Sequence, residues 1–243
     1  MQEKIIEFSA HKDYLKYKEE YPKLIKSSVP EWFKKLEHTI DGKTVKGCVP
    51  FLQTLISGYL LTLPQDFHLK HNIVGNESIS TTLDASTEID YGFNLNIKNR
   101  PEQHTGDQIK DSPHLKKNNS LFVNKFLNPW TIKTPVGYSC LFVPPLNNVD
   151  ERFSIIPAIV DTDTFKLPVN FPFIVNGDKF PVLDTVLKKG TPYVQVIPFK
   201  RDSWKMKIKP LNENNDIWKK GKYWLTHLHN YKTIFWNKDI TWK

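Results

Sequence analysis

The sequence predicts a mainly β, α+β fold built from short strands. Residues 134–202 contain four short apolar runs separated by Pro, Gly, Asn and Asp, a spacing typical of a compact sheet. Residues 91–97 (Tyr-Gly-Phe-Asn-Leu-Asn-Ile) alternate strictly between apolar and small side chains, which indicates a half-buried strand. Seventeen prolines against ten glycines indicate many rigid turns and strand ends.

Two short helices are predicted before the strands. Pro30 suits the first turn of one helix, and Ser28 suits its cap. Pro50 suits the first turn of the second helix, which extends to about Ser57. Gly58 suits the left-handed position just past the end of that helix.

Further along the chain, we expect strands and one C-terminal helix. The strands are expected at 59–63, 67–73, 129–133, 137–143, 153–160, 169–175, 180–186 and 192–199. The stretch 99–120 is polar, and a loop of that length is usually functional or mobile. Residues 215–236 predict a helix with one apolar stripe, formed by Trp224, Leu228, Tyr231 and Phe235.

The composition is that of a folded domain that needs no cross-links, because 243 residues can bury a large core. We expect one domain over 1–243, with a helical part at 1–58, a β-rich core at 59–200 and a basic, aromatic helix or tail at 201–243. Cys48 and Cys140 lack metal-ligand spacing, so we predict buried free thiols and a reducing compartment. Without a visible leader or membrane-length apolar run, we expect a cytoplasmic or virion-associated protein with no membrane partner.

The net charge of +8 is concentrated at 12–46 and 200–243. Solvated flanks are the simpler interpretation, and a polyanion-binding face is the alternative. In the tail, tryptophans such as Trp204 interleave with lysines, as they do in single-strand nucleic-acid binders. The stripe at 224–235 favours instead an amphipathic helix packed on the sheet, so a nucleic-acid partner is disfavoured.

Two motifs carry a resemblance to a known family. The segments 135–139 (Pro-Val-Gly-Tyr-Ser) and 195–201 (Gln-Val-Ile-Pro-Phe-Lys-Arg) resemble blocks of a phage and bacterial protein family of unknown activity. The resemblance extends more weakly back to about Pro50. It implies a phage-type accessory or structural-interaction protein, whose protein partner the motifs do not identify.

The order of motifs also resembles the superfamily of dUTP pyrophosphatases and dCTP deaminases. Segments 136–138, 159–165 and 190–195 stand where those enzymes have a proline-glycine-tyrosine strand, an aspartate-containing turn and a late glutamine-containing strand. This resemblance implies a β-clip-like sheet domain and a homo-oligomer, with a trimer expected. Similarity at the level of the fold does not by itself carry function.

The same resemblance supplies candidate site residues. The aspartate of the middle turn binds the sugar and orients water in those enzymes, which makes Asp161 the candidate catalytic residue and places Asp163 beside it. An ionised carboxylate can accept hydrogen bonds from both a hydroxyl and a water. The candidate ligand-binding residues are Tyr138, Gln195, Lys200 and Arg201.

A structural interpretation of these residues stands beside the catalytic one. The segment 161–164 (Asp-Thr-Asp-Thr) is good turn material, in which aspartate side chains cap their own backbone amides. The segment 144–148 (Pro-Pro-Leu-Asn-Asn) lacks the serine and arginine donors that hold phosphates in the enzymes. We therefore favour a non-catalytic protein without a cofactor, and a nucleotide hydrolase using Asp161, with Mg²⁺, is the alternative.

The histidine spacing does not indicate a metal centre. His68 and His71 would lie on opposite faces of one strand, and His11-Lys12-Asp13 precedes every predicted strand. Eight histidines in 243 residues produce such spacings by chance. We predict no metal site, and no Gly-x-Ser-x-Gly elbow indicates a serine nucleophile.

Overall fold

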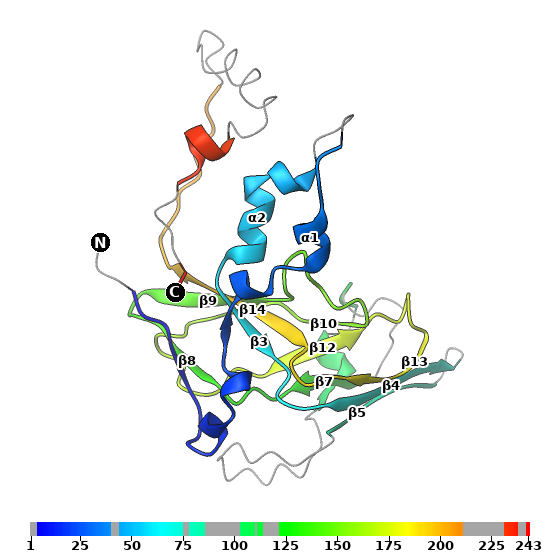
Figure 1. Cartoon of the computed structure of the whole chain (residues 1–243). Helices are drawn as coiled ribbons and strands as arrows, with labels where there is room; N and C mark the ends of the chain where they lie inside the picture. Colours follow the sequence, from blue (N-terminus) through cyan, green and yellow to red (C-terminus); the bar gives the residue numbers. More distant parts are fainter. Residues whose placement is uncertain are drawn as a thin grey trace. The chain divides into compact units, whose positions relative to one another are not determined.

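The computed structural model describes residues 4–39, 44–74, 78–85, 103–109, 111–113, 122–210, 231–237 and 242–243 (Figure 1). These residues group into two compact units. The first unit comprises Met1–Lys23 and Gly58–Lys200, and the second comprises Leu24–Ser57 and Arg201–Lys243. Segments 24–57 and 201–243 thus group together, and the single domain over 1–243 stays a prediction.

Four small antiparallel sheets form the first unit in the described residues. The largest has the order β11 (Ala158–Val160), β9 (Tyr138–Val143), β14 (Pro192–Lys200), β3 (Tyr59–Thr62) and β2 (Lys23–Leu24). The next has the order β10 (Phe153–Ile155), β12 (Phe171–Val175), β7 (Phe122–Phe126) and β6 (Gln103–Thr105). The two smaller sheets are β13 (Val182–Leu187), β4 (Phe67–Val74) and β5 (Ser78–Ala85), and β1 (Glu7–Ser9) with β8 (Thr131–Lys133). Three 3-10 turns complete the unit: η1 (Tyr14–Lys16), η2 (Lys18–Glu20) and η5 (Gly106–Ile109).

The predicted mainly β, α+β fold is confirmed. The strands expected at 59–63, 67–73 and 192–199 correspond closely to β3, β4 and β14. In β12, Phe171, Phe173 and Val175 are buried, and the two residues between them are half-buried. This period of two follows from the pleat of a strand with one face on the core. In the sequence, short apolar runs between Pro, Gly, Asn and Asp indicate these strands.

The strand expected at 153–160 is wrong, because this segment forms two strands in different sheets. β10 pairs with β12, and β11 pairs with β9. Beyond β10, Ile156 N still donates to Pro172 O at 2.8 Å, in continuation of the β10–β12 register. Pro157 follows and has no amide donor to continue the ladder. The chain therefore passes from one sheet to the other at this proline.

Three other expectations need comment. The polar stretch 99–120 contains β6 and η5 in its described part, so it is not wholly without regular structure. The strand expected at 91–97 and residues 215–230 of the predicted helix lie outside the described residues. Residues 231–235 form one π-helical turn, η6, whose Tyr231 and Phe235 are exposed. At these two positions, therefore, the predicted apolar stripe does not face a core.

Aromatic rings fill the core of the first unit. Phe126 on β7 stacks on Phe173 of β12 with centroids 4.2 Å apart. Phe153 and Tyr193 meet the same Phe126 ring edge-to-face, both at 5.4 Å. Such offset and edge-to-face pairs are the preferred aromatic geometries. They join strands of the four-stranded sheet to β14 of the five-stranded sheet.

The second unit contains α1 (Glu31–Lys35), α2 (Val49–Ile56), η3 (Ile25–Ser28), η4 (Val45–Gly47) and η6 (Tyr231–Phe235). Pro50 lies in the first turn of α2, as predicted. Pro30 is the N-cap of α1 rather than part of its first turn, and Ser28 closes η3 instead of capping α1, so that prediction is wrong. Lys26 Nζ donates to Trp242 O at 3.0 Å and ties the two segments of this unit together. None of the described helices is long and apolar enough to cross a membrane.

Candidate functional site

Two turns meet at the end of the five-stranded sheet where β11 pairs with β9. One precedes and begins β9, at residues 134–139, and the other follows β11, at residues 161–165. Thr134 N donates to Thr162 O at 3.3 Å and joins the turns through their backbones. We call these two segments the paired turns.

Both predicted carboxylates are engaged within the paired turns. Asp161 Oδ1 accepts the hydroxyl of Ser139 at 2.7 Å, and Asp163 Oδ2 accepts the backbone N–H of Gly137 at 2.8 Å. Gly137 has φ of 85°, a left-handed conformation that glycine adopts without strain. The backbone oxygen of Asp161 also accepts two N–H groups of its own turn, at 3.0 and 2.9 Å. Asp163 therefore caps the opposite turn, and Asp161 fastens the end of β11 to β9.

A chain of hydroxyl groups lies beneath these carboxylates. Thr134 Oγ1 and Thr162 Oγ1 lie 2.8 Å apart, and Thr162 Oγ1 donates to Cys140 Sγ at 3.3 Å. Burial raises the pKa of the Cys140 thiol to about 11, so this sulfur stays protonated at neutral pH. Both cysteines are free thiols, as predicted, but Cys48 is exposed rather than buried. Cys48 is the N-cap residue of the short helix α2, where core side chains do not cover its thiol.

Tyr138 and Lys200 are neighbours at the same end of the sheet, because they face each other across β9 and β14. Lys4 Nζ lies 5.8 Å from the centroid of the Tyr138 ring, in cation–π contact. Arg201 follows directly after β14 and is exposed. The structure thus brings Tyr138, Lys200 and the paired turns to one end of the sheet.

Gln195 lies elsewhere. It pairs with Val143, four residues along β9 from Ser139, which places it roughly 13 Å from the paired turns at ~3.3 Å per residue. Its side chain is fully buried, and its Oε1 accepts the backbone N–H of Leu146 at 2.9 Å. Gln195 therefore holds the loop after β9 in place and does not share a site with Asp161.

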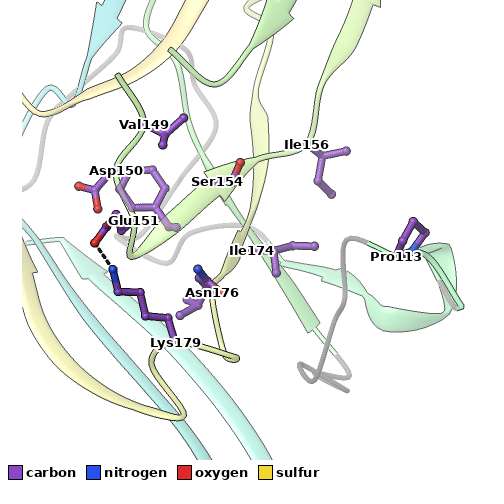
Figure 2. Close-up of a pocket in the computed structure, with 11 residues that line it drawn as sticks. Pro113, Val149, Asp150, Glu151, Ser154, Ile156, Ile174, Asn176 and Lys179 are labelled. Carbon is purple, nitrogen blue, oxygen red and sulfur yellow. Dashed lines mark hydrogen bonds and ion pairs between the residues drawn. The ribbon is translucent and has the colours of Figure 1, made fainter. Parts of the chain in front are cut away.

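Sequence reasoning missed a pocket of about 350 Å³ on the outer face of the four-stranded sheet (Figure 2). Ser154 and Ile174 line it from directly opposed positions on β10 and β12. Figure 2 shows the ion pair of Glu151 with Lys179 at one end and Pro113, from a separate segment, at the other. The run Asp-Glu-Arg at 150–152, directly before an apolar strand, was the signal that could have marked this place.

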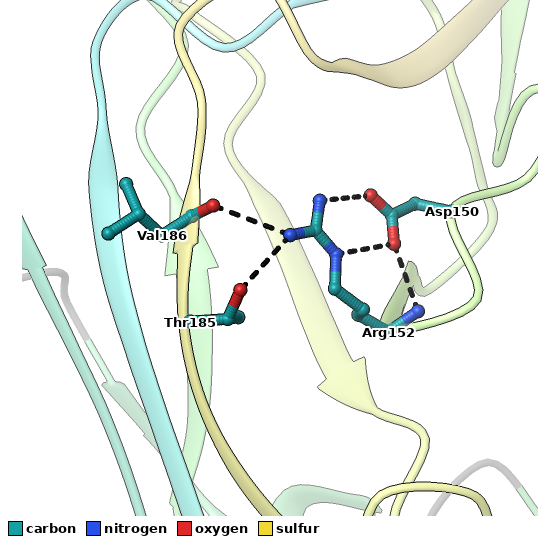
Figure 3. Close-up of polar contacts among 4 residues, drawn as sticks. All are labelled: Asp150, Arg152, Thr185 and Val186. Carbon is teal, nitrogen blue, oxygen red and sulfur yellow. Dashed lines mark hydrogen bonds and ion pairs between the residues drawn. The ribbon is translucent and has the colours of Figure 1, made fainter.

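An ion-pair network fixes the loop beside this pocket (Figure 3). Asp150 accepts from Arg152 Nε at 3.0 Å and from Nη2 at 2.6 Å, a two-point pairing. Arg152 Nη1 reaches across to Thr185 Oγ1 and Val186 O on β13, at 3.3 and 3.4 Å. The hydrogen bond to Asp150 raises the pKa of Arg152 above its ordinary value. These contacts hold the loop rigidly between two sheets.

Within the described part of the chain, no group of three or more His, Cys, Asp or Glu side chains could hold a metal ion. His71 is buried and His68 is partly exposed, on opposite faces of β4 as predicted. His68 Nε2 lies 2.5 Å from Asp184 Oδ1 on β13, and this contact lowers the pKa of Asp184. His68 and Asp184 thus form a surface pair between neighbouring strands.

Exposed apolar side chains surround the paired turns. Val136 is 92% exposed and lies within them, and Ile159 on β11, Phe165 and Leu167 are also exposed. β11 pairs with β9 on one side and is an edge strand among the described residues. Val136 and Phe165 lie in the paired turns, Leu167 follows them in the sequence, and Ile159 lies on the edge strand β11.

The sequence matches no protein-family model, and no curated protein shows significant similarity to it. The function therefore has to be argued from the geometry of the paired turns, from the pocket and from the resemblance that the motifs carry.

Proposed function

We propose that this chain is a structural-interaction protein of the phage accessory type, which works as a homo-oligomer and does not use Asp161 for catalysis. One observation carries the proposal, namely the engagement of both carboxylates inside the paired turns, at 2.7 Å from Ser139 Oγ and 2.8 Å from Gly137 N. A general base needs an oxygen within reach of the proton that it removes from the substrate or water, and Asp161 Oδ1 and Asp163 Oδ2 already accept hydrogen bonds within the protein.

The loop after β9 supports the same proposal. In the enzymes that the motifs resemble, the matching segment offers donors to phosphates. Here Leu146 N donates to Gln195 Oε1 at 2.9 Å, and Asn148 N donates to Pro145 O at 3.1 Å. Those amides are therefore occupied within the protein, and the prolines at 144 and 145 have none to offer.

The apolar side chains around the paired turns, Val136, Ile159, Phe165 and Leu167, support an interaction role. A surface of this kind, next to the free edge of β11, suits contact with another protein chain. Association of identical chains is the commonest way to cover it.

Two measurements test the proposal. Incubation with dUTP or dCTP and Mg²⁺ should release no pyrophosphate that depends on Asp161, and neither nucleotide should raise the unfolding temperature. Asp161→Asn is compared with Asp178→Asn, an exposed aspartate outside the paired turns. Pyrophosphate release that only Asp161→Asn abolishes, at unchanged stability, would overturn the non-catalytic assignment in favour of a nucleotide hydrolase.

The homo-oligomer is tested by light scattering over a wide concentration range. We expect a mass above that of the 28.4 kDa chain, rising with concentration. A species of chain mass at every concentration would contradict self-association.

A further inference from the structure

Shortly after β14 the chain contains a stretch that the rest of the described structure does not hold in place. All ten residues from 201 to 210 are exposed and lie outside every helix and strand. Within that stretch, residues 203–209 (Ser-Trp-Lys-Met-Lys-Ile-Lys) take part in no hydrogen bond, ion pair or ring contact with the described part of the chain. We call residues 203–209 the open segment.

The open segment meets the backbone requirement of an endopeptidase. Such an enzyme binds the chain that it cuts in extended form and engages its backbone groups, in the manner of an added strand. A hydrogen-bonded loop must first open to adopt that form, so its rate of cutting falls with the population of the opened state. The open segment has no backbone hydrogen bonds of its own to break. Exposed backbone of this kind is the preferred position of proteolytic nicking.

The side chains of the open segment indicate which peptide bonds are cut. Lys205, Lys207 and Lys209 are all exposed. An endopeptidase with a carboxylate at the base of its specificity pocket selects a basic residue directly before the bond that it cuts. Lys209 is followed by Pro210, whose ring nitrogen carries no hydrogen and whose φ is fixed, so that bond is a poor substrate. The bonds Lys205–Met206 and Lys207–Ile208 remain.

We propose that the open segment is a processing site, which an endopeptidase that selects lysine cuts after Lys205 or Lys207. The peptide C–N bond breaks and one water is consumed, so that the lysine carbonyl becomes a carboxylate and the next nitrogen becomes a new amino terminus. Every strand of the first unit ends at or before Lys200, so the cut leaves its sheets whole. This inference goes beyond the proposed function and does not rest on it.

Lys166 provides a matched comparison within the same chain. It is exposed, and an apolar residue, Leu167, follows it, as in the open segment. Its loop is nevertheless fixed on both sides, because Phe165 N donates to Asp161 O at 2.9 Å and Val169 is buried. The bond after Lys166 therefore has to wait for the loop to open, whereas the bonds in the open segment do not.

Brief digestion of the native chain with trypsin, followed by mass spectrometry of the new amino termini, measures the rate of cutting at each bond. Cuts after Lys205 and Lys207 should form at least about 10-fold faster than the cut after Lys166, because only the latter requires hydrogen bonds to break. In a heat-unfolded sample the same bonds should be cut at similar rates, which separates the effect of the fold from the preference of trypsin. Equal rates in the native chain, or no cut in the open segment, would overturn the proposal.

Variants assign the cut to its lysines. The double variant Lys205→Gln with Lys207→Gln should lose the early cut, Lys205→Arg with Lys207→Arg should keep it, and Lys166→Gln should cut like wild type. Pro210→Ala should add a cut after Lys209. Far-ultraviolet circular dichroism of the cut protein should retain the strand signal. An early cut that survives the double glutamine variant, or a cut that abolishes the strand signal, contradicts a processing site that leaves the sheets whole.

Discussion

Gly58→Ala tests the close approach between Gly58, directly before β3, and strand β14. Gly58 has φ of 84°, which an L-residue with a β-carbon adopts only at a cost of roughly 1–2 kcal/mol. An added Cβ would lie 2.2 Å from the carbonyl oxygen of Val196, far inside van der Waals contact. The clash involves backbone rather than a side-chain tip, so it cannot be relieved by a rotamer change.

Val196 is poorly placed to move. It pairs with Tyr59 on one side and with Phe142 on the other, in the centre of the five-stranded sheet. Relieving the clash would distort both ladders, and each lost hydrogen bond costs about 0.5–1.5 kcal/mol. With one hydrogen bond lost in each ladder and the conformational cost added, we expect Gly58→Ala to lower the free energy of unfolding by roughly 2–5 kcal/mol.

Gly190→Ala is the matched control. Its φ is also 84°, but no atom outside its chain neighbours lies within 4 Å of the added Cβ. Both substitutions change the unfolded chain equally, so their difference isolates the clash. Urea unfolding followed by tryptophan fluorescence measures it, and Gly190→Ala should lose only about 1–2 kcal/mol. Equal losses from the two variants would refute the argument that Val196 is immovable.

Two further predictions concern Asp163 and the two cysteines. Asp163→Ala should lower the free energy of unfolding by about 1 kcal/mol, because it removes the acceptor for Gly137 N at 2.8 Å. The control substitution Asp178→Ala should change the free energy of unfolding little. Thermal unfolding measures both variants, and no loss of stability from Asp163→Ala would contradict its role as a cap. In the native protein near pH 8, a thiol reagent should modify exposed Cys48 and spare Cys140, whose pKa is raised to about 11 by burial. In urea both should react, and fast native labelling of Cys140 would show that its cover opens.

Several features of this protein follow from local sequence alone. The apolar runs in 169–175 and 192–199, separated by Pro, Gly, Asn and Asp, predict strands. Pro50 and Gly58 mark the two ends of α2, because their backbone preferences are intrinsic to those residues. For the candidate site, local sequence predicts only a turn at 161–164 whose aspartates cap their own backbone amides.

Other features depend on segments far apart in the chain, and only the tertiary structure decides them. That Asp163 caps Gly137, 26 residues away, depends on the register of β11 against β9. Residues 153–160 divide into two strands because β10 pairs with β12 and β11 pairs with β9. The pocket depends on the pairing of Ser154 with Ile174. Local periodicity specifies which side of a strand is apolar, whereas partner and register are selected by packing among all the strands.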